Sequence, residues 1–141
     1  MSDVRTMLSE FKKGMETLGK EIPEQLKAFT GFVGTVQKEG ALTAKEKELI
    51  AVALGIARSC DTCVVARTVS ALKAGCTKQQ ILEAAAMAIA FAGLPAVASS
   101  ATLLVQTLEE FGSKDTVAVE ILEPPGYCRP TQRYLCFFLS P

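Results

Sequence analysis

The sequence predicts an all-α, oligomeric fold of about six helices. Apolar residues recur at helical spacing in six segments, and capping residues, glycines or prolines separate these segments. No segment before VAVEIL at 117–122 alternates as a strand does. The chain has 141 residues, of which 49% are hydrophobic and 21% charged, a composition typical of a single globular domain. We expect this domain to cover residues 1–112.

Start and stop signals place the first three helices. Ser2 is the expected cap of a first helix that stops near Gly19. Pro23 suits the first turn of a second helix, which ends at Gly40. Thr43 begins an S/T-x-x-E capping box, which opens a third helix through ELIAVALGIA.

Similar signals place the last three helices. Small and polar cap candidates at 59–61 open a fourth helix that runs to Gly75. A second capping box at Thr77 opens a fifth helix, QILEAAAMAIAFA. Pro95 opens the sixth, AVASSATLLVQTLEEF, which stops at Gly112.

The last two helices predict a homo-oligomer. Residues 84–106 carry no charge, but Gly93 and Pro95 interrupt them and small residues dominate, so we expect two close-packed helices rather than a membrane span. Both helices are apolar on nearly every face, and one protomer of this length can hardly cover both. A monomer with an alanine-rich centre is the alternative.

Charge and cysteine content bound the partners and the compartment. Fifteen basic residues balance fifteen acidic ones, which gives no electrostatic reason to expect nucleic acid or an anionic membrane as a partner. The start, MSDVRTMLSEFKK, lacks the pattern of a signal peptide. We therefore expect a cytoplasmic protein, in which a CxxC pair is redox-active or metal-binding rather than a structural disulfide.

The tail at 113–141 differs in composition from the rest of the chain. It is rich in proline near EPPGYCRP, has an aromatic end and follows no helical period. A family-specific extension, a packing arm and a translation artefact all remain open for it. We expect Cys128 and Cys136 within it to be non-catalytic.

The segment CDTCVVAR at 60–67 is the strongest candidate site. Cys60 lies at the expected start of the fourth helix and Cys63 within its first turn, where free N–H groups and the helix dipole favour a thiolate. Their spacing lets the two sulfurs form a disulfide across the turn. Two buried, unreactive cysteines are the alternative, and simple packing is the expected role of Cys76.

A metal site is not expected at this segment. A structural zinc needs four ligands, but the chain has no histidine and no second CxxC. We therefore predict no metal and no cofactor.

Glu48 stands twelve residues before Cys60, on the preceding predicted helix. An antiparallel helix pair would bring its carboxylate beneath the two cysteines. The apolar run that follows suggests partial burial, which would raise the pKa of Glu48 toward the range useful for proton transfer. The alternative is a solvated glutamate favoured by the helix dipole.

Residues 46–95, EKELIAVALGIARSCDTCVVARTVSALKAGCTKQQILEAAAMAIAFAGLP, carry a family resemblance. The order E-x11-C-D-x-C, a helix ending in AG, T-x-x-x-I-x-E-A and an apolar helix leading to a proline resembles the carboxymuconolactone decarboxylase and alkylhydroperoxidase D-like family. The resemblance implies an all-helical subunit that forms trimers or hexamers. Its decarboxylase members act on a lactone acid and lack the CxxC, so this chain resembles the peroxidase-like branch.

The resemblance also implies roles for individual residues. Members with the dithiol reduce hydroperoxides and are re-reduced by a thiol or dihydrolipoyl donor. Cys63 matches the cysteine oxidised to a sulfenic acid, Cys60 the one that completes the disulfide, and Glu48 the acidic relay residue. The helix-dipole argument alone would instead favour Cys60 as the attacking thiol.

Arg67 departs from the family pattern, which has a histidine at this position. It lies four residues after Cys63, so the two side chains can meet on one helix face. A guanidinium can hold a thiolate by charge but cannot shuttle a proton at neutral pH. An ion pair between Arg67 and Glu48, or another nearby acid, is the alternative role.

The leading functional prediction is therefore a thiol-dependent peroxidase, or dithiol–disulfide oxidoreductase. Its catalytic candidates are Cys60, Cys63, Glu48 and Arg67. The alternatives are a lactone-acid decarboxylase-like enzyme and a non-enzymatic helical redox-sensing assembly.

Overall fold

The computed structural model describes residues 3–112, and all regular secondary structure in this part is helical. The helices are α1 (Val4–Glu21), α2 (Pro23–Gln37), α3 (Ala44–Ala57), α4 (Asp61–Lys73), α5 (Lys78–Ala92), α6 (Leu94–Ser99), the π-helical η1 (Ser100–Leu104) and α7 (Val105–Phe111). Because α6, η1 and α7 follow one another without a break, they form one continuous helical rod, and the described chain has six such rods, as predicted. The predictions for 113–141, including Cys128, Cys136 and the 117–122 segment, lie outside the described residues.

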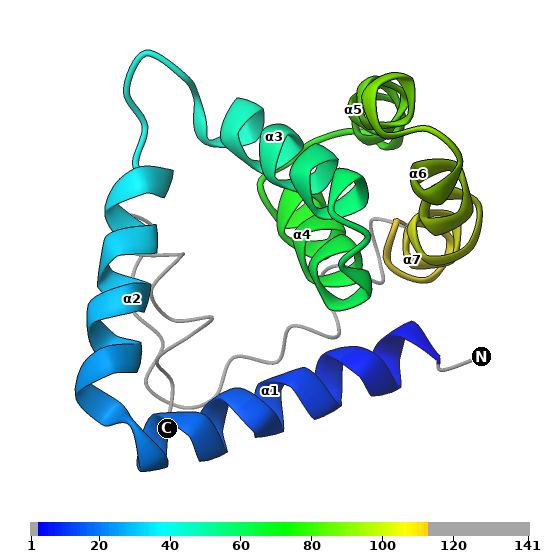
Figure 1. Cartoon of the computed structure of the whole chain (residues 1–141). Coiled ribbons are helices and arrows are strands. Elements are labelled where there is room, and N and C mark those ends of the chain that lie inside the picture. The colour runs from blue at the N-terminus through cyan, green and yellow to red at the C-terminus, as the bar shows by residue number, and fades with distance from the viewer. Residues whose placement is uncertain (1–2, 113–141) are drawn as a thin grey trace.

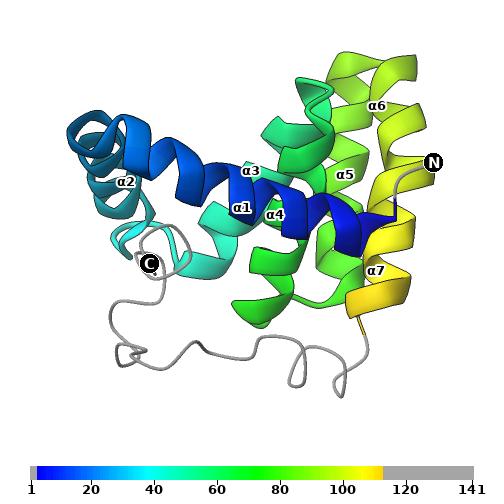
Figure 2. The ribbon, with the colours of Figure 1, turned by 90° about the horizontal axis from the view of Figure 1, so that it is seen from below.

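The helices form a body, made of α3 to α7, and an arm, made of α1 and α2 (Figure 1). Helices α3 to α7 pack together as the body, with α3 beside α4 and α5. Helix α1 crosses the body over α4, and α2 turns back from the far end of α1 toward the start of α3 (Figures 1 and 2). The arm therefore returns the chain to the end of α3 that carries Glu48.

The two predicted capping boxes are confirmed. The Thr43 hydroxyl accepts a hydrogen bond from the Glu46 amide, while the Glu46 carboxylate accepts one from the Thr43 amide. Thr77 and Gln80 make the same reciprocal pair at the start of α5. Each box satisfies amides that the first turn of a helix leaves unpaired.

Two helix ends differ from the prediction. Helix α1 continues through Gly19 to Glu21, because one glycine weakens a helix by only about 1 kcal/mol, whereas Pro23 excludes helical geometry at the residue before it. Helix α2 ends at Gln37 rather than at Gly40, since Lys38 has extended backbone angles. The N-cap of α1 is Asp3, and Ser2 lies outside the described residues.

Buried aliphatic side chains from α3, α4, α5 and the last rod form the core. Its largest fully buried members include Val52, Ile56, Val64, Ile81 and Leu104. At the N-terminus, Val4 is fully buried, and Arg5 pairs with Glu110 and lies over the Phe111 ring, 5.4 Å from its centre. These contacts hold the start of α1 against α7.

Several large apolar side chains lie on the surface of the single chain. On the last two rods, Met87, Phe91 and Leu94 are 60%, 85% and 77% exposed. On the arm, Phe29 and Phe32 of α2 are also exposed. The predicted oligomer stays a prediction, and these are the surfaces it would cover. Among the described helices, none is both long enough and apolar enough to cross a membrane.

Candidate dithiol site

The site is built on the junction between α3 and α4. Ser59 adopts a left-handed conformation with φ of 52°. Its amide donates to the Ile56 carbonyl, and the Cys60 amide donates to the Gly55 carbonyl at 3.1 Å. This is a Schellman ending for α3. Cys60 is also the N-cap of α4, so one residue closes the first helix and opens the second.

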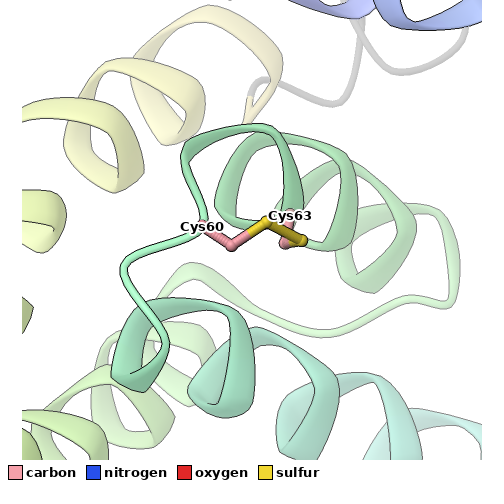
Figure 3. The surroundings of a disulfide bond; sticks show 2 residues. All are labelled: Cys60 and Cys63. Carbon is pink, nitrogen blue, oxygen red and sulfur yellow. A yellow bond between two sulfur atoms is a disulfide. The ribbon is translucent and has the colours of Figure 1, made fainter.

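Cys60 and Cys63 form a disulfide across the first turn of α4 (Figure 3). Their Cα atoms lie 5.2 Å apart. Cys63 is exposed and Cys60 is half-buried, so solvent reaches one sulfur-bearing residue more readily than the other. No side chain caps the first-turn amides of α4, in contrast to α3 and α5.

Gly55 allows α4 to approach α3 closely beside the disulfide. A Cβ atom at this position would lie 3.3 Å from the Cβ of Cys63 and 3.4 Å from the Val64 amide nitrogen. Only a residue without a side chain accommodates this spacing without a shift of α4. The glycine therefore fixes the position of Cys63 against α3.

The carboxyl group of Glu48 is buried between three helices, with 1% of the residue exposed. Gln37, at the end of α2, donates a long hydrogen bond of 3.4 Å from Nε2 to Glu48 Oε1. Arg67 of α4 places a guanidinium nitrogen 3.8 Å from Oε2, an ion pair but too long for a hydrogen bond. Oε2 has no hydrogen-bond partner among the described residues.

Burial raises the pKa of Glu48 above its ordinary value, and the charge of Arg67 opposes part of this rise. The raised pKa agrees with the prediction made from the apolar run after Glu48. The ion pair with Arg67 is one of the two roles considered for that residue. A guanidinium in this position can also reach toward Cys63, because helical side chains lean toward the N-terminus of their helix.

Glu48 and the disulfide lie at separate levels of the α3–α4 pair. Glu48 contacts Arg67, whereas Gly55, two turns further along α3, faces Cys63. Seven residues of helix correspond to about 10 Å along the axis. Arg67, one turn after Cys63, is therefore the side chain that lies between the carboxyl group and the cysteines.

Cys76 is buried outside the pair, as its predicted packing role requires. Its thiol donates to the Lys45 carbonyl at 3.7 Å. Burial raises the pKa of the Cys76 thiol, the charge of Lys45 lowers it, and the charge of Glu48 raises it. Across residues 3–112, no three His, Cys, Asp or Glu side chains gather as metal ligands.

Sequence reasoning missed two residues of the site. Gly55 was read only as part of an apolar helix, although an isolated glycine in such a helix signals a close approach. Gln37 gave no signal, because its role depends on how α2 meets α3. The structure joins Cys60 to Cys63 and Glu48 to Arg67, and it adds Gly55 and Gln37 to them.

Two uncharacterised bacterial proteins are similar to this chain in sequence. An uncharacterised protein of Cupriavidus necator is 37% identical over 94 residues, which cover 67% of this chain and 83% of that protein. An uncharacterised protein of Haemophilus influenzae is 34% identical over 65 residues, 46% of this chain and 58% of its own length.

Structural and family comparisons point the same way. The crystal structure of an apo carboxymuconolactone decarboxylase family protein from Legionella pneumophila matches with a TM-score of 0.72 and 30% identity. The match covers 77% of this chain and 97% of the Legionella protein. Residues 23–106 also match the model of that family, and this range includes α2 to η1 and every residue of the site. The chain belongs to the carboxymuconolactone decarboxylase family.

Proposed function

We propose that this chain is a thiol-dependent peroxidase that reduces hydroperoxides through the Cys60–Cys63 pair. The observation that carries the proposal is a disulfide between one exposed and one half-buried cysteine, at a helix start that no side chain caps. The unpaired amides of such a helix start favour a thiolate over a thiol when the pair is reduced. The family includes enzymes, which supports an enzymatic role.

The proposed reaction has three steps. The Cys63 thiolate attacks the terminal peroxide oxygen, the O–O bond breaks, and Cys63 becomes a sulfenic acid; the alkoxide that is released takes a proton from solvent water and leaves as an alcohol. The Cys60 thiol then attacks that sulfur, the disulfide forms and water leaves. A dithiol donor, of dihydrolipoyl type by family resemblance, reduces the disulfide by exchange and becomes oxidised itself.

Cys63 is the proposed attacking residue because it is the more exposed of the two. This agrees with the role implied by the family resemblance and differs from the one favoured by the helix dipole alone. Arg67 would stabilise the Cys63 thiolate by charge, and Glu48 would exchange protons with water near the pair. Without a histidine at residue 67, we expect slower proton transfer than a histidine would give.

The experiment that tests this function is peroxide turnover with dihydrolipoamide as donor. Cys60→Ser and Cys63→Ser should each lower turnover at least about 100-fold, since neither can form the disulfide. Cys76→Ser is the matched control and should retain wild-type turnover. If both serine variants turn over peroxide as the wild type does, the proposal is wrong.

Two further measurements on the same variants separate the alternatives. A lactone-acid decarboxylase-like enzyme, suggested by the family name, would release carbon dioxide from its substrate in the absence of both thiols. A redox-sensing assembly would form and lose the disulfide stoichiometrically, without repeated turnover.

We further propose that residues 1–112 form the functional domain and that copies of it assemble into a trimer or hexamer. The exposed Met87, Phe91 and Leu94 support this assembly, because apolar clusters of this kind mark contact surfaces. Light scattering of the full chain would test it. The proposed setting is the cytoplasm, where thiol donors keep such a pair reduced.

A further inference from the structure

The carboxyl group of Glu48 is held by groups from outside its own helix. Gln37 of α2 contacts Oε1 and Arg67 of α4 approaches Oε2. Buried carboxylates normally accept several hydrogen bonds, yet this group accepts only one from the described residues. The direction in which Oε2 points therefore depends on a single amide.

We propose that Gln37 is a positioning residue of the site. It holds the Glu48 carboxyl group so that the Arg67 guanidinium can stabilise the Cys63 thiolate. The inference rests on the proposed function for its effect on turnover. Its effect on the carboxyl group itself does not depend on that function.

The geometry explains how Gln37 would act. A guanidinium and a carboxylate prefer a two-pronged contact, with two parallel hydrogen bonds of about 2.8 Å. Here the nearest nitrogen of Arg67 remains 3.8 Å from Oε2. The Gln37 amide draws Oε1 toward the end of α2, which opposes the rotation that would present both oxygens to Arg67. The guanidinium keeps hydrogen-bonding capacity for a thiolate one turn earlier on α4.

The end of α2 is fixed in a way that makes this contact persist. Lys47, beside Glu48 in sequence, donates from Nζ to the carbonyls of Val36 and Lys38, on either side of Gln37. The first turn of α3 thus binds the backbone around Gln37, while Gln37 binds the carboxyl group of α3. Lys47 touches the same junction without touching the carboxyl group.

Charged and titratable groups near Glu48 come from three segments. They are Arg67 from α4, the Cys76 thiol that follows α4, and Lys45, which acts on Cys76 from the first turn of α3. Gln37 is not titratable, and its amide is the donor within hydrogen-bond distance of the Glu48 carboxyl group. Loss of the amide would free the carboxylate for the two-pronged contact with Arg67, and a closer opposite charge favours the charged form, so the pKa of Glu48 should fall.

The test uses the full chain with Gln37→Met, which keeps the length of the side chain and removes the donor. The pKa of Glu48 is read from the chemical shift of its carboxyl carbon, assigned by comparison with Glu48→Gln. The expected result is a downward shift of the titration midpoint, together with a loss of peroxide turnover of about threefold at pH 7, because Arg67 becomes engaged with Glu48. Gln37→Leu, should Gln37→Met fold poorly, also removes the donor and is expected to shift the midpoint in the same direction.

Lys47→Met is the matched control, because it loosens the same junction and leaves the Gln37 amide in place. It should move the Glu48 midpoint less than Gln37→Met does. An unchanged or raised midpoint in Gln37→Met, or an equal shift in both variants, overturns the inference. If the wild type shows no peroxide turnover but the midpoint still shifts selectively, the proposed function is wrong and the positioning of Glu48 by Gln37 stands.

Discussion

The chain makes the same backbone turn twice, once after α3 and once after α4. In both turns a left-handed residue, Ser59 or Gly75, is followed by a cysteine whose amide donates five residues back, to Gly55 or Ala71. The cysteines nevertheless have different surroundings. The first is bridged to a second cysteine, whereas the second is buried and donates to a backbone carbonyl.

The two cysteines differ in their surroundings because each stands at a different position relative to the N-cap of the next helix, with an offset of one residue. Cys60 is itself the N-cap of the next helix, so Cys63 falls in the first turn. Cys76 stands one residue before the N-cap, and Thr77 occupies that position with a capping box. The amides that could stabilise a thiolate are therefore satisfied at the second turn and left without a side-chain cap at the first. The placement of the cap, more than the turn, decides whether a cysteine is suited to redox chemistry.

The largest expected effect is on thiol reactivity. In the reduced protein at pH 7, iodoacetamide should label the faster of Cys60 and Cys63 about 100-fold faster than Cys76. Cys76 is 5% exposed, and burial raises its pKa, so both access and ionisation are poor. Peptide mass spectrometry over time measures the rates, with labelling in urea as the control. Equal rates in the folded protein would contradict the comparison.

The second-largest effect concerns the close packing of α3 against α4 at Gly55, beside the turn that precedes Cys60. Gly55→Val should lower the free energy of unfolding by about 2–3 kcal/mol, because the new side chain meets Cys63 and Val64. Urea denaturation of the oxidised protein measures this. Gly14→Val is the control, since no atom lies within 4 Å of a Cβ built at this exposed glycine. A loss of similar size in both variants would show that the close approach is unimportant.

A third prediction concerns the two caps. Thr77→Ala should lower the free energy of unfolding by about 1 kcal/mol, because the amide of Gln80 loses its acceptor. Cys60→Ser should be more stable than the reduced wild type by about 0.5–1 kcal/mol, because a serine hydroxyl can cap α4. Thermal or urea unfolding in reducing buffer measures both changes. If Cys60→Ser gains nothing, the start of α4 is already satisfied.

The smallest effect concerns Glu48, whose charge acts on both Arg67 and Cys76. Its raised pKa means that the folded state holds the proton more tightly than the unfolded state. The resulting stability is present at low pH and is lost as pH rises from the ordinary carboxyl pKa through the raised one. Glu48→Gln should therefore raise Tm at pH 7 by roughly 2–3 °C.

This gain should shrink toward zero at pH 4, where the wild-type carboxyl group is already protonated. Calorimetry at the two pH values makes the comparison. Glu16→Gln, an exposed position on α1, controls for general charge effects. A larger gain at pH 4 than at pH 7 would contradict the assignment.

Much of the fold was predictable because its signals are local. The two capping boxes, Pro23 and Gly93 act within a few residues of the helix ends that they define, and the structure has helix ends at all of these places. The end of α1 was misplaced because a glycine within a helix resembles a stop signal, while the actual stop is the residue before Pro23. Local signals of this kind need no knowledge of packing.

The site was predictable only where its residues share a helix. Cys60, Cys63 and Arg67 follow one another at helical spacing, and Glu48 was placed by assuming that α3 and α4 are antiparallel. Gln37 and Gly55 were not found, because their importance comes from contacts between helices. Such contacts depend on side-chain volumes across an interface, which a single sequence does not display.

The junction at Cys60 also determines what the oxidised bond can do for the fold. A bridge that closes only four residues restricts the unfolded chain little, and chain-entropy models give it roughly 2 kcal/mol at most. The Schellman turn, the packing at Gly55 and the core of α3 and α4 are formed by contacts other than this bond. The helices thus serve as a rigid frame whose integrity does not depend on the oxidation state of the sulfurs. We therefore expect reduction and reoxidation of this bond to proceed without an unfolded form.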